Sequence, residues 1–199
     1  MGCGSAAERT GDEGPAAGEG DGGEAALDAG TCPAAPDLVV PLQTAVNDAA
    51  VHWPLIKGCV DVTHTAAVDP FLSKIADALA AWSSVACSRL CFEAPHLVAD
   101  GHEGARHELR FTAGEGPTTA QPKFDGPSGV IIWGKVHIGV DAPPSGRALI
   151  TVIGLTLGLN RPTDAAVDSV MHATAAAGAP TDNDAASLCV LYGSPAYCE

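Results

Sequence analysis

The chain has 199 residues, with 24 acidic against 10 basic side chains and a formal net charge of -14. This length fits one domain with an additional tail, since domains commonly span about 100–200 residues. The excess of negative charge makes nucleic acid and anionic membrane surfaces poor partners. No apolar run approaches the roughly 18 residues of a membrane-spanning helix, so the sequence predicts no transmembrane segment.

The first part of the chain, residues 1–31, consists mainly of glycine, alanine and acidic residues. Such a composition has little apolar surface to bury, so we expect a disordered linker here and a folded domain over residues 32–199. The start, Met1-Gly2-Cys3-Gly4, is similar to the end of a bacterial lipoprotein signal peptide, which makes Cys3 a lipidation candidate. This interpretation requires a basic and apolar segment upstream of Met1. An unmodified cysteine in a flexible tail is the alternative.

Seven cysteines predict an oxidising compartment, and therefore an exported protein. If Cys3 is set aside, six remain, which could form three disulfides among about 15 pairings. The favoured pair is Cys189 with Cys198, because the two flank a short Gly-Ser-Pro turn. A further pair is expected among three cysteines on or beside predicted strands, Cys59, Cys87 and Cys91. A zinc site is less favoured, because Cys87-x-x-x-Cys91 has no matching second pair.

The folded domain is predicted to begin with a strand, a helix and a second strand. Alternation over Cys59–His64 indicates a strand with one buried face. Asp69-Pro70 favours the start of a helix. Apolar residues at helical spacing then predict about four amphipathic turns that pack on a sheet: Phe71, Leu72, Ile75, Leu79 and Trp82. The segment Val85–Phe92 is predicted as the second strand.

Between Glu93 and Glu108 the sequence is polar, and we expect a surface loop. His102-Glu103 looks like the start of the zinc motif H-E-x-x-H. The next histidine, His107, is five residues further on rather than four, so the two side chains would not share a helix face.

Three further strands complete a predicted sheet of five. Glu108–Thr112 is the third, and a loop rich in glycine, proline and threonine is expected over Ala113–Ser128. Gly129–Trp133 and Lys135–Val140 are predicted as two strands joined by a tight turn around Gly134.

The most apolar stretch, Arg147–Arg161, predicts a buried helix because its hydrophobic residues lie almost all round. Gly158 supplies the left-handed conformation that ends such a helix. A loop of small residues is then expected over residues 173–180. Asp182-Asn-Asp184 is predicted to cap a last helix over Ala185–Leu191.

The positions of Gly158 and Met171 resemble those in metzincin metallopeptidases, in particular bacterial matrixin-like domains. This family has the motif H-E-x-x-H-x-x-G-x-x-H followed by a methionine turn. When the motif glycine is placed on Gly158, the turn methionine falls on Met171. The order of the early elements and the ending Leu191-Tyr-Gly193 are also similar, so the resemblance covers roughly residues 50 to 193. The motif's three histidines and its glutamate then align with Thr151, Leu155, Arg161 and Val152, respectively.

The resemblance implies an α+β fold: a five-stranded mixed, mostly parallel twisted sheet with a backing helix, an active-site-type helix and a C-terminal helix. In metzincins the fourth strand is an antiparallel edge that pairs with extended substrate over the cleft. Val130 to Trp133 takes that place in the predicted order of strands. Extended peptide or protein along Val130–Trp133 is therefore the expected partner.

The aligned residues lack the chemistry of a zinc peptidase. Hydrolytic zinc needs three nitrogen or oxygen ligands and an open position for water. Leu155 has no lone pair, Thr151 is at best a weak neutral ligand, and Arg161 would bring a cation to a dication. Val152 cannot take a proton from water. We therefore predict a catalytically inactive metzincin-like (pseudo)metallopeptidase domain without a cofactor, exported, and acting as a peptide-binding or structural module.

Two alternatives remain open. The first is an active zinc metalloendopeptidase with non-standard ligands, drawn from His137, His172 or the pair His102 and His107. His137 alternates with Val136 and Ile138, so it is expected to face away from them, in a structural or solvent-facing role. The second alternative is a secreted α+β domain of unknown role.

Overall fold

The computed structural model of the chain describes residues 40–45, 48–54, 58–102, 104–174 and 176–193. The chain divides into two units, Met1–Gly30 and Thr31–Glu199, and all described residues belong to the second. The predicted linker, the lipidation candidate Cys3 and Cys198 lie outside the described residues. Among those that are described, no helix is long and apolar enough to cross a membrane.

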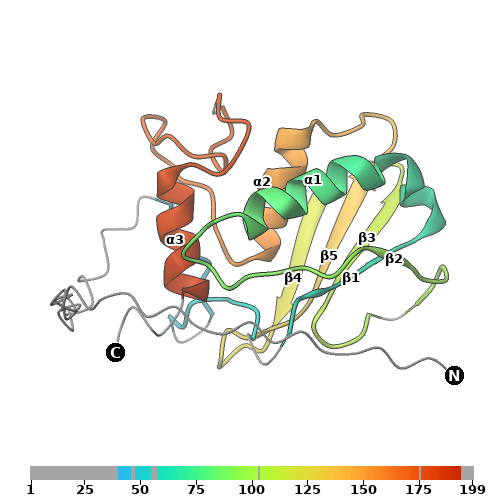
Figure 1. Cartoon of the computed structure of the whole chain (residues 1–199), viewed down its shortest axis with the longest axis horizontal. Coiled ribbons are helices and arrows are strands. Elements are labelled where there is room, and N and C mark those ends of the chain that lie inside the picture. The colour runs from blue at the N-terminus through green and yellow to red at the C-terminus, as the bar shows by residue number, and fades with distance from the viewer. Residues whose placement is uncertain (1–39, 46–47, 55–57, 103, 175, 194–199) are drawn as a thin grey trace, which may run out of the picture. The chain divides into compact units, whose positions relative to one another are not determined.

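The domain is an α+β fold built on a five-stranded, mixed and mostly parallel sheet, as predicted (Figure 1). Its strand order is β2-β1-β3-β5-β4. The first four strands in this order run parallel to their neighbours, and β4 is an antiparallel edge strand. The strands are β1 Asp61–His64, β2 His96–Leu97, β3 Glu108–Gly114, β4 Thr119–Phe124 and β5 Ile131–Gly139.

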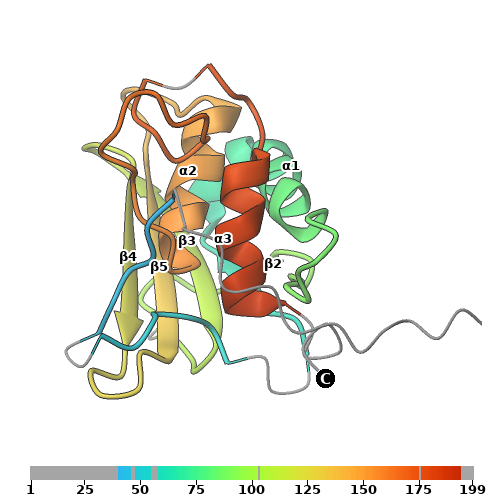
Figure 2. The same cartoon turned by 90° about the vertical axis from the view of Figure 1, so that its left-hand side faces the viewer.

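Three helices accompany the sheet: α1 Leu72–Ser83, α2 Gly146–Thr156 and α3 Asp182–Tyr192. A 3-10 helix, η1 Ala66–Phe71, leads into α1. Figure 2 shows α1 and α2 on one side of the sheet. The two are joined where Trp82 Nε1 donates a hydrogen bond of 2.9 Å to the Ile150 carbonyl oxygen. The buried apolar core therefore lies between these helices and one face of the sheet.

The strand register separates the sheet into a helix-covered face and an opposite face, here called the open face. Apolar side chains with no solvent exposure point to the helices: Val62, Leu109, Phe111, Val136 and Ile138. The alternate residues of β3, β5 and β4 are mostly polar and lie opposite one another on the open face. These are Glu108, Arg110 and Thr112, then Trp133, Lys135 and His137, and finally Thr119, Gln121 and Lys123. His137 thus faces away from Val136 and Ile138, as expected.

The glycine-terminated helix is confirmed as α2. Ser145 Oγ accepts the Ala148 N–H at 3.2 Å and caps its start. At its end, Gly158 has a φ of 91°, which favours glycine, and a Cβ at this position would collide with the Val51 carbonyl oxygen.

The predicted second strand, Val85–Phe92, is wrong: this segment forms turns, with isolated bridges from Ser88 to Gly193 and from Phe92 to Val60. Its apolar residues Val85, Leu90 and Phe92 pack against the core, and the segment also holds cysteines of two disulfides. Cys59 pairs with Cys91, which confirms a pair within the predicted group. Cys189 pairs with Cys87 rather than with Cys198, because α3 packs beside this segment.

The placement of the edge strand was also wrong. The expected loop Ala113–Ser128 contains the edge strand β4, whereas Ile131–Trp133 forms the start of β5, between β3 and β4, and Val130 makes an isolated bridge to His52. No turn occurs at Gly134, and β5 runs straight through it. A Cβ at Gly134 would lie 3.1 Å from both Leu109 and Trp53, so the glycine there allows close packing.

The last helix begins earlier than predicted. Thr181, not the segment Asp182–Asp184, is the N-cap of α3. The Asp184 carboxylate reaches back to the Thr181 backbone N–H at 2.9 Å, which forms a capping box. The aspartates therefore lie inside the first turn.

Candidate functional site beside the edge strand

The positions aligned with the zinc motif lie on and after α2, which packs against β4 and β5. Thr151 and Val152 are buried, with 7 % and 6 % of their surface exposed. Leu155 is half-buried and packs against the core, and its carbonyl oxygen accepts a 2.7 Å hydrogen bond from Gln43 Nε2. Arg161 lies beyond the helix and is exposed. The aligned positions are thus divided between the core and the surface.

The Thr151 hydroxyl connects α2 to the loop of residues 169–173, here called the Met171 loop. Its Oγ1 lies 2.9 Å from the Val170 carbonyl oxygen and 3.1 Å from the Arg147 carbonyl oxygen. A hydroxyl has a single proton to donate, so that proton is committed within the protein. The residue therefore holds two segments together.

Met171 is fully buried beneath α2. A Cβ added at Gly154 would collide with Met171 Sδ and would lie 2.8 Å from the Trp82 ring. The helix consequently approaches the Met171 loop closely only because residue 154 is glycine. A methionine suits such a contact, since its flexible thioether fills irregular gaps.

The Met171 loop is held from two further directions. The Asp184 carboxylate of α3, with no exposed surface, accepts hydrogen bonds from Ser169 Oγ at 2.5 Å and from the Val170 N–H at 2.8 Å. Arg147 Nη2 of α2 donates to the carbonyl oxygens of His172, at 2.6 Å, and Ala173, at 3.1 Å. The loop is therefore held in place by both α2 and α3.

The edge strand β4 presents two different sides. Thr119, Gln121 and Lys123 are exposed on the open face, whereas the alternate residues Ala120, Pro122 and Phe124 are half-buried on the helix side. No described strand pairs with the outer edge of β4. Proline has no N–H, and within sheets it occurs on edge strands with its nitrogen toward solvent. An added strand would thus find one donor fewer at Pro122.

A cavity of about 480 Å³ adjoins the end of β4, between the start of β3 and the β4–β5 turn. Arg106 and His107, both exposed, are among the residues that line it. The turn itself is fixed by a hydrogen bond of 3.0 Å from Ser128 Oγ to Asp125 Oδ2.

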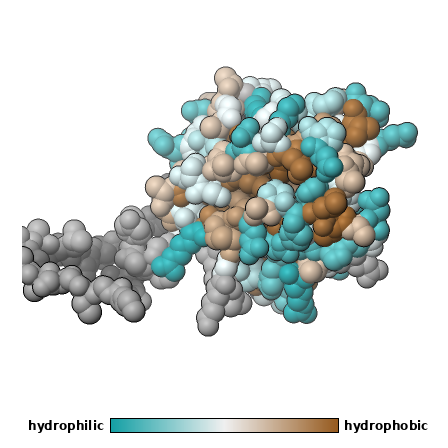
Figure 3. All heavy atoms as spheres, turned by 45° about the vertical axis from the view of Figure 1, so that its right-hand side comes forward, coloured by the Kyte–Doolittle hydropathy of each residue, from teal (hydrophilic) through white to brown (hydrophobic). Residues whose placement is uncertain are grey.

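The opposite edge of the sheet has an exposed apolar side chain, Leu97 on β2, which is 60 % exposed. It borders a second cavity of about 340 Å³ beside η1. Figure 3, turned toward that side of the molecule, shows hydrophobic patches among hydrophilic residues.

The histidines considered as alternative zinc ligands occupy separate places. His137 Nε2 lies 3.1 Å from the Glu115 carbonyl oxygen, and His172 Nδ1 accepts the Thr174 N–H at 3.2 Å. His102, on the loop before β3, contacts the carboxylate of Glu108 at the start of that strand. Over the described part of the chain, no three or more His, Cys, Asp or Glu residues form a group suited to a metal ion.

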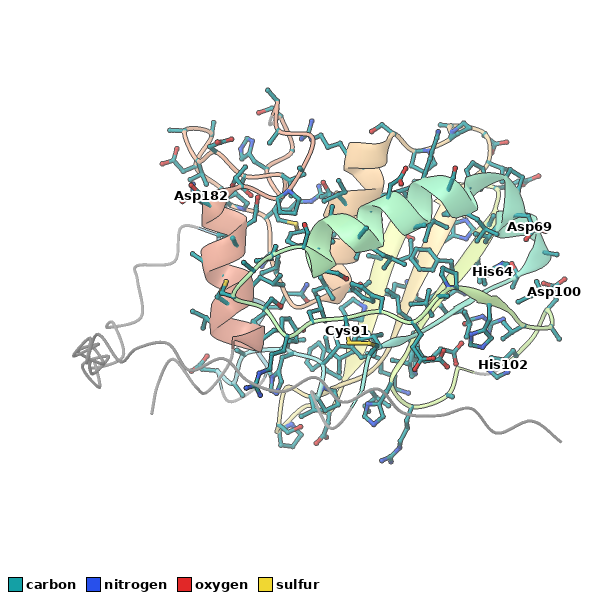
Figure 4. All side chains as sticks on the ribbon, in the orientation of Figure 1. His64, Asp69, Cys91, Asp100, His102 and Asp182 are labelled. Atoms are coloured by element: carbon teal, nitrogen blue, oxygen red, sulfur yellow. A yellow bond between two sulfur atoms is a disulfide. The ribbon has the colours of Figure 1, made fainter. Side chains whose placement is uncertain are left out.

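Glu108 is a buried carboxylate with several hydrogen-bond donors. Burial raises its pKa, but hydrogen bonds from the Thr63 hydroxyl, the Ala105 N–H and His102 lower it more strongly, so the pKa lies below its ordinary value of 4.5. Figure 4 shows His64 and Asp69 close together where β1 leads into η1, with His102 on the loop before β3. His64 Nδ1 lies 3.5 Å from Asp69 Oδ1.

Several of these residues were not predicted from the sequence. Arg147 and Asp184 order the Met171 loop, and Thr181-x-x-Asp184 matches the capping-box pattern that would have located α3. The grouping of Arg110, Lys123 and Lys135 on the open face had no sequence signal, because it depends on the register of three strands.

No family model and no curated protein matches the sequence. Among solved structures, a similar chain belongs to one described as "Structure of a chaperone-substrate complex", with a TM-score of 0.40 and 10% sequence identity. The similarity covers 70% of this chain and 34% of that chain, so this chain spans about a third of its length.

Proposed function

We propose that this domain is a non-catalytic, metzincin-like module that binds extended peptides along the outer edge of β4. The observation that supports this proposal is the packing of α2 beside that edge. Where the zinc motif has histidines and a glutamate, α2 has Thr151, whose hydroxyl bonds to Val170, together with apolar Val152 and Leu155. This arrangement favours a structural helix over a metal centre.

The peptide-binding part of the proposal draws on the position of β4. It is the fourth strand in chain order, antiparallel to its neighbour and at the sheet edge. The strand that pairs with substrate in metzincins has the same character. Main-chain hydrogen bonds to an exposed edge supply affinity, and alternate side chains supply specificity. α2 packs against β4 and is itself bonded to the Met171 loop, so the edge is supported before a peptide arrives, which reduces the entropy lost on binding.

Export is part of the same proposal. Two disulfides, Cys59–Cys91 and Cys87–Cys189, are compatible with an oxidising compartment. Attachment of a lipid at Cys3 would tether the domain to a membrane surface. Mass spectrometry of the protein expressed from its natural gene would detect the acylated N-terminal peptide.

The metal-free part of the proposal is tested by zinc content. The full chain is dialysed against trace zinc, with unfolded protein as the control for non-specific binding. We expect negligible zinc and a melting temperature that does not respond to a chelator. One tightly held equivalent of zinc, lost together with folded stability on chelation, would contradict the proposal and support a metallopeptidase with non-standard ligands.

The binding part is tested by hydrogen exchange. Heptapeptides that alternate valine with glutamate or with glutamine are added to the full chain. We expect slower exchange of β4 amides, with the exposed surface of α1 as an internal control. If saturating peptide leaves residues 119–124 unchanged, strand addition at this edge is wrong.

A further inference from the structure

Three positively charged side chains lie side by side on the open face. In the strand register, Arg110 of β3 is opposite Lys135 of β5, Lys135 is opposite Gln121 of β4, and Lys123 of β4 is opposite Trp133. The chain has only 10 lysines and arginines against 24 acidic residues. A cluster of this sign is therefore contrary to the overall charge of the protein.

In the described part of the chain, these three cations have no carboxylate partner. Within the described residues, no carboxylate oxygen lies within 4.0 Å of their nitrogens, and Arg110 Nε is buried without a hydrogen bond. Like charges directly opposite each other in a sheet are destabilising. A bound anion would relieve this repulsion.

The neighbouring groups do not neutralise the cluster. Lys123 Nζ lies 5.7 Å from the centroid of the Trp133 ring, an attractive contact that leaves its charge intact. Glu108 is separated from Lys123 by Trp133 in the strand register, and its carboxylate accepts hydrogen bonds from Thr63, Ala105 and His102 on the side away from β4. Asp61 lies one strand further from β4, on β1, with its Oδ1 3.4 Å from His96 Nδ1. The β4 side of the open face is consequently the positive side.

The helix side of β4 has the opposite character. Ala120 and Phe124 are half-buried apolar side chains packed against the core, as is Leu155 of α2, the helix that contacts β4. A side chain that enters from the outer edge on this side meets apolar surface, which favours an apolar residue.

We infer that the peptide bound at β4 alternates carboxylate and apolar side chains. The inference rests on the proposed function and names the class of ligand. Successive side chains of a strand point to opposite faces of the sheet. Carboxylates at every second position would lie beside Lys123 and within reach of Lys135, while the residues between them would face Ala120, Phe124 and Leu155.

The first test compares three heptapeptides that contain valine at alternate positions and glutamate, glutamine or lysine between them. Binding to the full chain is measured by fluorescence anisotropy at low ionic strength. We expect the glutamate peptide to bind about fivefold more tightly than the glutamine peptide, since exposed ion pairs are individually weak. The lysine peptide should bind least. The advantage of glutamate should vanish at about 0.5 M salt, where exposed charges are screened.

The outcomes separate the two proposals. Equal affinity for the glutamate and glutamine peptides, with β4 amides protected by both, would overturn the inference and leave the proposed function intact. No binding of any of the three would overturn both. A glutamate peptide methylated on its backbone nitrogens controls for simple charge attraction. If it binds as tightly as the unmethylated form, the carboxylates act without strand addition, which contradicts the inference.

The second test uses substitutions in the protein. Lys123→Gln and Lys135→Gln should each weaken binding of the glutamate peptide about two- to threefold without changing the affinity for the glutamine peptide. Lys74→Gln removes an exposed charge from α1, on the other side of the sheet, and is the matched control. An equal effect of all three substitutions would show that only net charge matters, and would overturn the inference.

Discussion

The Ser169 hydroxyl donates a hydrogen bond of 2.5 Å to Oδ1 of Asp184, a carboxylate with no solvent exposure. Oδ2 of the same carboxylate accepts the N–H groups of Val170, at 2.8 Å, and Thr181, at 2.9 Å. One residue of α3 therefore fixes the segment before Met171 and also starts its own helix. The arrangement explains how α3 and the Met171 loop are held together.

Replacing Asp184 by alanine should destabilise the domain by about 3 kcal/mol. The substitution leaves the buried Ser169 hydroxyl and two backbone N–H groups without an acceptor, and unsatisfied buried donors are costly. Urea denaturation of the full chain measures the change. Asp182→Ala is the control, since Asp182 is an exposed acid in the same helical turn. This substitution should lower the free energy of unfolding by at most a few tenths of the loss expected for Asp184→Ala. Similar losses for both variants would contradict the role given to Asp184.

Replacing Gly154 by alanine tests the contact between α2 and Met171. The added Cβ collides with Met171 Sδ and with the Trp82 ring, so we expect a loss of about 1–3 kcal/mol and altered tryptophan fluorescence. Gly146→Ala, in the same helix, adds a methyl group where no atom lies within 4 Å, and its stability should remain within about 0.5 kcal/mol of the original. A neutral Gly154→Ala variant would show that the loop moves freely.

The predictable part of this fold is the part governed by local periodicity. The 3.6-residue spacing of Ile75, Leu79 and Trp82 located α1, and Gly158 located the end of α2, because burial on one face and a left-handed turn leave a mark on consecutive residues. The fold class was predicted from the resemblance to metzincins, and the structure confirms an α+β fold with a mixed, mostly parallel sheet.

The edge of the sheet could not be predicted in the same way. Gly134 has the composition of a turn, yet it is a glycine because Trp53 and Leu109 pack against it, and both are distant in sequence. Polar residues and Pro122 made β4 resemble a loop, although an edge strand tolerates both. The cationic side of the site depends on the register of three strands, which no single segment encodes.

The buried Glu108 carboxylate should make stability depend on acid. Its pKa is lower in the folded than in the unfolded protein, so the folded state binds protons less readily. The corresponding stabilisation is complete above the ordinary value of 4.5 and is lost as the pH falls through the lower, folded value.

Urea denaturation between about pH 3 and pH 7 measures this dependence against a Glu108→Gln variant. The original protein should lose stability relative to the variant as the pH falls below 4.5. Glu115→Gln, which removes an exposed acid after β3, is the control and should preserve the original profile. Identical pH profiles for the original and the Glu108→Gln protein would contradict the paired, ionised state of Glu108.

The disulfide connectivity makes a separate prediction. Proteolysis of the oxidised chain followed by mass spectrometry should yield a peptide pair joined through Cys87 and Cys189 and another joined through Cys59 and Cys91. The first pair closes a loop with a sequence separation of 102 residues and the second a loop of 32. Chain-entropy arguments make the longer closure more stabilising by about 1 kcal/mol. A double Cys87→Ser, Cys189→Ser variant should therefore lose more stability than a double Cys59→Ser, Cys91→Ser variant. In the mass-spectrometry experiment, a Cys189–Cys198 peptide pair would contradict the connectivity, because it would leave Cys87 without its partner on α3.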